Sequence, residues 1–184
     1  MKRLFVSLSV LYSVLAFGTA TADEGTSILR NIPPAWSKAL RCDKHACPRF
    51  ELVLGGAAVL DHETGLVWER SPSLGLLGWH NAMHFCNLLN VGNRLGWHLP
   101  TIEQLASLID TSSPNYPSGD GGGLPVGHPF TGVPAFAAFW SATTSAFGTD
   151  QAMSIGFGSP QSAVKTGGAF NVWCVRGGQS HDGK

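Results

Sequence analysis

Residues 96–105 read Gly96-Trp97-His98-Leu99-Pro100-Thr101-Ile102-Glu103-Gln104-Leu105, and this stretch decides the fold. The ring of Pro100 excludes helical backbone angles at Leu99, so the chain enters the corner in extended geometry. The Thr101 hydroxyl can then accept a hydrogen bond from a free amide of a new helix, and the Gln104 side chain can reach back to the Thr101 amide as a capping box. The sequence therefore predicts a strand end, a sharp corner and a helix start.

The hydrophobic residues around this corner predict its buried faces. Trp97 and Leu99 alternate along the extended part and share one side, whereas Leu105, Leu108 and Ile109 form a stripe on the helix. The stretch contains no nucleophile, no pair of carboxylates and no cluster of metal ligands, which argues against a catalytic motif. We therefore interpret it as a structural corner formed by Trp97, Pro100, Thr101 and Gln104.

The chain before the corner predicts a hairpin and a first helix. Within residues 50–70, Asp61-His62-Glu63-Thr64-Gly65 separates two hydrophobic segments. An aspartate with a glycine four residues later suits a type I turn whose last residue is left-handed. From Trp79 to Asn90, hydrophobic residues recur at intervals of three and four and mark one face of a helix. These residues are Trp79, Ala82, Met83, Cys86 and Leu89.

The chain after the corner predicts a long loop and then strands. Residues 111–135 are rich in proline and glycine, and a long irregular loop inside a compact domain is commonly functional. A passive loop packed by its own side chains is the alternative. Strand-like segments separated by turns fill residues 136–176. The order of elements predicts an α+β fold, with two helices packed on a small twisted antiparallel sheet and a long Pro/Gly loop.

The first 22 residues have the composition of a cleavable secretory signal peptide. Met1-Lys2-Arg3 supplies a basic start, an apolar run follows, and Ala20-Thr21-Ala22 fits the cleavage site. The apolar run is short for a transmembrane helix, and no later segment predicts one. We therefore expect a protein that is secreted or periplasmic, without a transmembrane segment.

Charge is unevenly distributed along the expected mature chain. Removal of Lys2 and Arg3 from the 12 basic and 12 acidic residues leaves 10 against 12, a net charge of −2. Basic residues concentrate in a leader, 23–49, whereas the domain that follows is mildly acidic. The leader can dock on its own domain or stay solvated, or it can bind an anionic polymer or a membrane surface. The domain itself lacks the basic surface of a nucleic-acid-binding protein, so we expect no nucleic acid partner.

The four cysteines of this expected exported chain indicate disulfides. Three pairings are possible. Cys42 and Cys47 most simply close a small loop in the leader, which leaves Cys86 to pair with Cys174 and to join the first helix to the last strand. A redox or metal pair at Cys42 and Cys47 is the alternative, although redox pairs have the spacing C-x-x-C.

A metal site is the strongest route to an enzymatic function in this sequence. His80 and His84 lie four residues apart on the first helix, and His98 is the nearest third histidine. No carboxylate follows at a useful spacing, so an exposed histidine pair is the expected arrangement and no metal site is assigned. A Ser/His/Asp set or a pair of catalytic acids is likewise not evident. We expect no cofactor and no catalysis.

Five motifs occur in the order found in one family. They are Gly65-Leu66-Val67-Trp68, Trp79…Ala82…Cys86, Trp97-His98-Leu99-Pro100-Thr101-Ile102-Glu103-Gln104-Leu105, Phe139-Trp140-Ser141 and Trp173-Cys174-Val175-Arg176-Gly177. From about Phe50 to Gly178 the chain resembles the C-terminal domain of the collagen-like bacterial adhesin Lcl. The resemblance implies a C-type-lectin-like domain over 50–178. The composition of the remaining residues, 179–184, predicts a polar tail. It also implies the disulfide between the first helix and the last strand, and binding to extracellular polysaccharide, including sulfated polysaccharide.

The sequence departs from related proteins in several respects. It has no collagen-like Gly-x-y tract and no strongly basic domain surface, and it lacks the Glu-Pro-Asn, Gln-Pro-Asp and Trp-Asn-Asp triplets of calcium-dependent lectins. We therefore predict no calcium site of the kind found in calcium-dependent lectins. The formylglycine-generating enzymes are also similar in their Leu-Pro-Thr corner, but their catalysis needs a reactive cysteine pair. A metal- or cysteine-dependent enzyme remains a minor alternative.

Together these features favour a binding module for extracellular carbohydrate, whose ligand surface is the loop 111–135 and the adjoining sheet. Aromatic rings can offer flat apolar faces to a sugar, and polar side chains can add directional hydrogen bonds. The candidate ligand-binding residues are Tyr116, Asp120, His128, Phe130, Trp140 and Asn171. The alternative for each of the six is ordinary packing or loop polarity, and the place of Trp140 in a predicted strand favours the core. The alternative is a structural module that binds another protein of the cell envelope, which an exposed hydrophobic patch would indicate.

Overall fold

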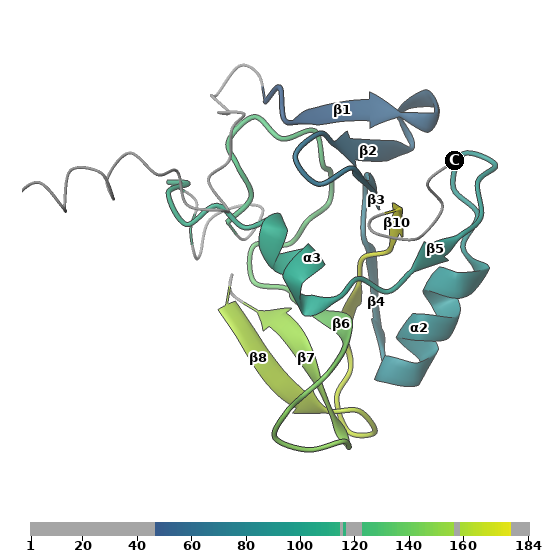
Figure 1. Ribbon diagram of the computed structural model, residues 1–184, viewed down its shortest axis with the longest axis vertical. Helices are drawn as coiled ribbons and strands as arrows, with labels where there is room; N and C mark the ends of the chain where they lie inside the picture. The colour runs from purple at the N-terminus through teal and green to yellow at the C-terminus, as the bar shows by residue number, and fades with distance from the viewer. Residues whose placement is uncertain (1–46, 115, 117–122, 157–158, 178–184) are drawn as a thin grey trace, which may run out of the picture. The chain divides into compact units, whose positions relative to one another are not determined.

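The computed structural model of the chain describes residues 47–114, 116, 123–156 and 159–177. The expected signal peptide, most of the leader with Cys42, and the polar tail lie outside the described residues, as does Asp120 in the long loop. The described residues form two five-stranded sheets and two α-helices (Figure 1). This arrangement confirms the α+β class.

The first sheet contains both ends of the described domain. Its order is β1-β2-β3-β10-β5, and every neighbouring pair is antiparallel. The strands are β1 (Phe50–Val53), β2 (Ala58–Asp61), β3 (Leu66–Glu69), β5 (Trp97–His98) and β10 (Val175–Gly177). A single 3-10 turn, η1 (Leu54–Gly56), connects β1 to β2. β10 is the last strand in the chain, yet it lies between β3 and β5. The sheet therefore joins the end of the described domain to its beginning.

The predicted hairpin between residues 50 and 70 corresponds to β2 and β3. Gly65, at the end of the turn, has φ +70°, a backbone conformation that glycine adopts without steric cost. Its amide donates to the carbonyl of Asp61 at 2.8 Å, and the Asp61 carboxylate accepts from the Glu63 amide and the Thr64 hydroxyl. These contacts fix the turn and with it the register of β2 against β3.

The second sheet is a difference from the single antiparallel sheet that the sequence predicts. Its order is β4-β9-β6-β7-β8, and β9 pairs with β6 in parallel, through Phe139 and Asn171. The strands are β4 (Ser73–Leu77), β6 (Ala138–Thr144), β7 (Gln151–Gly156), β8 (Ser159–Val164) and β9 (Phe170–Val172). After β8 the chain passes to the far side of β6 instead of adding to the free edge of β8. Sequence-neighbouring segments commonly pair, and this connection is an exception.

The corner at residues 96–105 joins the two parts of the core. Thr101 is the N-cap of α3 (Ile102–Ser107): its hydroxyl accepts from the Gln104 amide at 3.3 Å, and the Gln104 side chain accepts from the Thr101 amide at 2.9 Å. Trp97 and Leu99, before the cap, are buried in one hydrophobic cluster. Leu105 and Leu108, after it, are buried in the other. The corner therefore passes the chain from one cluster to the other.

Trp173 is the centre of an aromatic group in the first cluster. Its ring lies 5.7 Å from Trp68, 5.0 Å from Phe130 and 5.4 Å from Phe139, measured between centroids. These separations and tilted geometries suit aromatic pairs, which prefer edge-on or offset contact. The Trp173 indole also donates to the Glu69 carbonyl at 2.9 Å, which satisfies its only polar atom.

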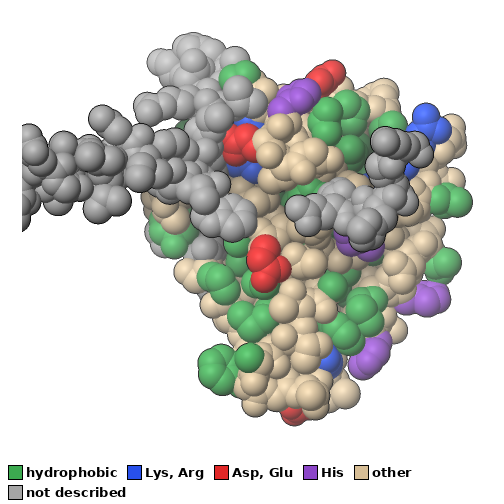
Figure 2. Space-filling view, viewed as in Figure 1, with side chains coloured by type: hydrophobic (Ala, Val, Ile, Leu, Met, Phe, Trp, Pro, Cys, Tyr) green, Lys and Arg blue, Asp and Glu red, His purple; other side chains and the backbone are tan. Residues whose placement is uncertain are grey.

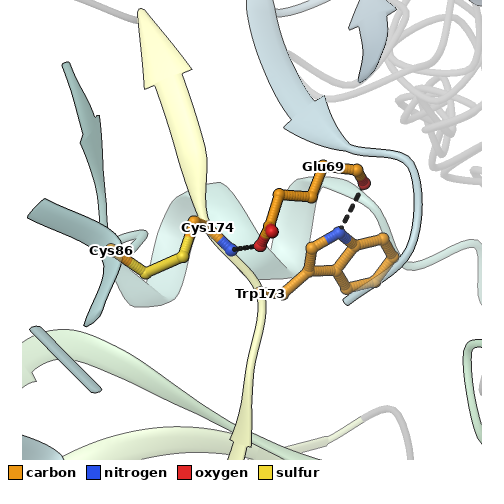
Figure 3. The surroundings of a disulfide bond; sticks show 4 residues. All are labelled: Glu69, Cys86, Trp173 and Cys174. Atoms are coloured by element: carbon orange, nitrogen blue, oxygen red, sulfur yellow. Dashed lines mark hydrogen bonds between the residues drawn. A yellow bond between two sulfur atoms is a disulfide. The ribbon is translucent and has the colours of Figure 1, made fainter. Parts of the chain in front are cut away.

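The second cluster packs around α2 (Trp79–Leu88), with Trp79, Ala82 and Cys86 on its buried face. This is the face that the sequence predicts, although the helix ends two residues before the expected Asn90. Cys86 forms a disulfide with Cys174, whose Cα atom lies 5.4 Å away (Figure 3). The predicted link between the first helix and the segment that leads into the last strand is therefore present.

An ion pair anchors the start of the described domain. Arg49 is fully buried, and its guanidinium donates to both carboxylate oxygens of Asp61, at 2.8 and 2.6 Å. It also donates to the Ser107 carbonyl at 2.8 Å and lies over the ring of Phe50. Arg49 is the last residue of the expected basic leader, yet its charge is neutralised inside the domain. Cys47, just before it, is disulfide-bonded.

Candidate functional site

The described parts of the long loop, residues 111–114, 116 and 123–135, pack onto the domain. Leu124 and Phe130 are buried in the first hydrophobic cluster. The Leu124 carbonyl accepts from the Ser113 hydroxyl at 3.0 Å, and the Thr131 amide donates to the Arg70 carbonyl at 2.9 Å. In these parts the loop packs its side chains into the hydrophobic core of the domain. This arrangement agrees with the alternative stated above, a passive loop packed by its own side chains.

The structure buries two of the three aromatic residues proposed to contact a ligand. Phe130 is 6% exposed and Trp140 is 0% exposed. The Trp140 indole donates to the Leu77 carbonyl at 2.7 Å, and its ring lies 4.4 Å from that of Phe170. Their rings therefore face protein atoms, which differs from the expectation that they offer open faces to a sugar. Tyr116 is half-buried.

The two described polar residues proposed for the same site, His128 and Asn171, make separate contacts with the domain. Asn171 is half-buried, and its side-chain amide donates to the Ala138 carbonyl at 3.2 Å, within the second sheet. His128 packs against Phe130, with ring centroids 5.7 Å apart, and burial lowers the pKa of His128. Its buried Nδ1 atom makes no hydrogen bond within the part of the chain that the structure describes. Asp120 lies outside the described residues.

A groove beside α2 offers a more open surface. Its volume is ≈ 440 Å³, within the range of about 300–1,000 Å³ that is usual for ligand sites. The residues that line it are Leu77, Asn81, His84, Phe85, Leu88, Leu89 and Asn90. In Figure 2, histidine and hydrophobic side chains gather over α2 at the right edge of the molecule.

Helical periodicity explains how these side chains come together. Asn81, His84, Phe85 and Leu88 follow one another at spacings of three, one and three residues, so they form one stripe along the helix. Leu77 contributes from the end of β4. Leu88 is 68% exposed, which is high for a leucine on a helix of a folded domain. The sequence predicts His84 as one of an exposed histidine pair, and the structure confirms its exposure. The groove was not predicted, although the spacing of the stripe is present in the sequence.

The three histidines considered for a metal site occupy different environments. His80 and His84 are exposed on α2, and the His80 ring contacts the edge of Trp79. His98 is half-buried; burial lowers its pKa, and hydrogen bonds to the Gly96 backbone and the Gln104 side chain oppose that shift. Among the described residues no three His, Cys, Asp or Glu side chains lie close enough together to hold a metal ion.

Glu69 is a buried carboxyl next to the disulfide (Figure 3). Its side chain accepts a hydrogen bond from the Cys174 amide at 2.8 Å. Burial raises the pKa of Glu69 from 4.5 to about 7, and the hydrogen bond from Cys174 opposes this shift. Cys86 and Cys174 are both fully buried and joined to each other, so neither presents a free thiol to a substrate.

Comparison with known proteins gives one family match. The model of the family described as the Lcl C-terminal domain matches residues 57–176. The matched range begins in the β1–β2 connection and ends in β10, and it includes α2, the corner and the disulfide. A search of curated proteins found no match.

Proposed function

The chain belongs to the Lcl C-terminal domain family, and from this membership we propose that it is an adhesin-like binding module for extracellular carbohydrate. The proposal includes a C-type-lectin-like fold and the absence of catalysis. The disulfide between α2 and the segment before β10, and the closing of the first sheet by the last strand, support the fold assignment.

The observation that carries the carbohydrate proposal is the groove beside α2. Sugars present apolar C–H faces together with hydroxyl groups, so proteins bind them with aromatic or aliphatic surfaces next to amide and imidazole groups. The groove combines these features: Phe85 and Leu88 supply the apolar surface, while Asn81, His84 and Asn90 supply donors and acceptors. This groove replaces the long loop as the proposed ligand surface.

An exported location fits the covalent structure. Disulfides persist in oxidising compartments such as the periplasm and the cell exterior. The buried disulfide between Cys86 and Cys174 therefore supports an oxidising compartment. The signal-like composition of residues 1–22 is consistent with export. In the described part of the chain, no helix has the length and hydrophobicity needed to cross a membrane. We propose a secreted or periplasmic protein.

A second candidate function is a structural module that binds another envelope protein. The hydrophobic surface of the groove favours it, because Leu88 is 68% exposed and lines the groove together with Phe85. Leu95 and Phe147 are 64% and 88% exposed but do not line the groove. Clustered exposed hydrophobic residues commonly mark protein contacts, whereas single ones are ordinary. The groove can serve either function.

A glycan array with matched surface variants tests the proposal. Leu88→Asp places a charge in the groove, and Leu95→Asp places one at a similarly exposed leucine outside it. We expect a glycan signal from the full chain that Leu88→Asp removes and Leu95→Asp retains, with both variants melting cooperatively. A pull-down from envelope extract runs beside the array. The absence of any glycan signal, together with one stoichiometric protein partner, would reject the carbohydrate function in favour of the second candidate.

A further inference from the structure

The chemistry of the groove beside α2 restricts the class of sugar that it can hold. Its lining residues, all of which the structure describes, include no Lys, Arg, Asp or Glu. A sulfated or carboxylated polysaccharide therefore finds no opposite charge there, and burying part of an anion without a partner is unfavourable. The lining favours a neutral ligand.

The polar groups of the groove are available for a ligand. In the described part of the chain, no side-chain hydrogen bond engages Asn81, His84 or Asn90, so these groups are not committed to the fold. Each asparagine amide offers two N–H donors and one carbonyl acceptor, and can pair with a group that also both donates and accepts. A secondary amide is such a group.

The apolar groups of the groove are aliphatic as well as aromatic. Leu77, Leu88 and Leu89 supply methyl groups to the same lining as the half-buried ring of Phe85. A plain hexose has a C–H face that can lie on the ring but no methyl group to place against the leucines. An acetamido group has a methyl, an N–H and a carbonyl together, so it matches both kinds of lining residue.

Asn81 and Asn90 lie toward opposite ends of this surface. Asn81 is in the first turn of α2, and Asn90 follows the C-cap residue Leu89. The helical part alone, from Asn81 to Leu88, rises roughly 10 Å at about 1.5 Å per residue. The surface is therefore long enough to contact more than one sugar ring of a linear chain.

From these contacts we infer that the groove beside α2 binds neutral N-acetylated sugars in a polysaccharide chain, and this inference rests on the carbohydrate function proposed above. The acetamido methyl packs against the leucines, the sugar face packs on Phe85, and the acetamido N–H and carbonyl pair with Asn81 or Asn90. Selectivity over a plain hexose follows because the hexose leaves these amides and methyl groups unmatched.

Calorimetric titration of the full chain tests this inference with two neutral probes. The N-acetylglucosamine trimer carries acetamido groups, and the glucose trimer of the same linkage does not. We expect the acetylated trimer to bind about tenfold more tightly or better, since tenfold corresponds to one or two net hydrogen bonds and their packing. We expect Asn81→Leu, which removes the amide, to abolish most of this difference.

Asn87→Leu is the matched control. Asn87 is exposed on the same helix but does not line the groove. Both substitutions replace asparagine by a better helix former, so both variants should keep the melting temperature of the parent chain. Asn87→Leu should retain the preference for the acetylated trimer. If it lost the preference as Asn81→Leu does, the groove assignment would be wrong.

The failure of this inference can be told apart from the failure of the proposed function. Equal binding of the two trimers, sensitive to Asn81→Leu, would overturn the acetamido preference and leave carbohydrate binding in place. Heparin binding that Asn81→Leu does not weaken, without binding of either trimer, would also overturn it, because the ligand surface would then lie elsewhere. A glycan array without any signal would remove the carbohydrate function itself.

Discussion

The side chain of Glu69 accepts a hydrogen bond from the backbone amide of Cys174, at 2.8 Å, directly beside the disulfide that joins Cys174 to Cys86. The backbone pairs the same two residues again, because the Glu69 amide donates to the Cys174 carbonyl at 3.2 Å. A buried carboxyl thus holds the segment that carries the disulfide against the end of β3. Its protonation state affects the stability of this contact.

We predict that the domain becomes less stable as the pH rises from about 4.5 to about 7. The pKa of Glu69 is raised from 4.5 to about 7 in the folded state, so unfolding in this range releases a proton. Higher pH favours the state that binds fewer protons, which is the unfolded one. The contribution of Glu69 is fully present below pH 4.5 and is lost as the pH rises through about 7. Its upper limit is about 3 kcal/mol.

Glu69→Gln isolates this effect. Glutamine keeps an acceptor for the Cys174 amide but carries no charge, so the variant should exceed the parent chain in stability at about pH 8 by up to about 3 kcal/mol. Below about pH 4.5 the advantage should disappear. Urea unfolding at several pH values measures it. Glu103→Gln, at an exposed carboxyl, is the control and should leave the pH dependence in place. Identical pH slopes for Glu69→Gln and the parent would contradict the prediction.

We predict that removal of the disulfide destabilises the domain by about 2–5 kcal/mol. Cys86 and Cys174 are 88 residues apart, and a bridge over so long a loop restricts the unfolded chain strongly. Alanine at both positions avoids leaving buried thiols without partners. Guanidinium unfolding of the double variant measures the loss. Peptide mapping without reduction checks the pairing, and a peptide that links Cys86 to Cys42 or Cys47 would show that the bridge is different.

The sequence predicted those parts of the fold that local chemistry determines. Hydrophobic spacing alone indicates the buried face of α2, because a helix repeats every 3.6 residues. The helix cap and the hairpin turn are likewise local. The capping partners Thr101 and Gln104 are three residues apart, and Asp61 and Gly65, at the two ends of the turn, are four residues apart. Each is fixed by sterics and hydrogen bonds that adjacent residues supply.

The parts that the sequence did not predict depend on contacts between distant segments. The parallel pairing of β9 with β6 brings together Phe139 and Asn171, and no local pattern records that register. Phe130 lies in a loop that the sequence marks as a candidate ligand surface, yet it is buried, because burial depends on which distant segments cover it. The groove combines a stripe on α2 with Leu77 from β4. The sequence contains the spacing of the stripe, but it does not indicate that Leu77 lies beside it.

We predict that Thr101→Ala destabilises the domain by about 0.5–2 kcal/mol and leaves ligand binding unchanged. The substitution removes the hydroxyl that accepts from the Gln104 amide. The next amide, of Ile102, keeps its own acceptor, the Thr143 hydroxyl at 3.0 Å, so the helix loses one cap contact and not two. Thr101→Ser retains the hydroxyl and should lose much less. If Thr101→Ala abolished binding at unchanged thermal stability, the corner would have to contribute to the ligand site.

The last prediction concerns the buried pair of Arg49 and Asp61. Both side chains are almost completely inaccessible to solvent, at 1% and 0% exposure, so the Asp61 carboxylate depends on Arg49 for neutralisation. Arg49 also lies 3.3 Å from the carboxylate of Glu63, which is 15% exposed. Removal of one member leaves the other charge buried, which typically costs about 3–5 kcal/mol. We therefore expect Arg49→Met to destabilise the domain by this amount, even though Met is a hydrophobic residue of similar length.

The double variant Arg49→Met, Asp61→Leu distinguishes a charge effect from a packing effect. With both charges absent, much of the loss caused by Arg49→Met should be recovered, because well-packed hydrophobic residues can replace a buried ion pair at little cost. Recovery should remain incomplete for two reasons. Asp61 also accepts from the Glu63 amide and the Thr64 hydroxyl in the turn before β3, and the Glu63 carboxylate loses its ion pair with Arg49. Unfolding free energies of the two single variants and the double variant form the required cycle. Strictly additive losses would show that the pair contributes through packing and the turn, and that its charges do not stabilise one another.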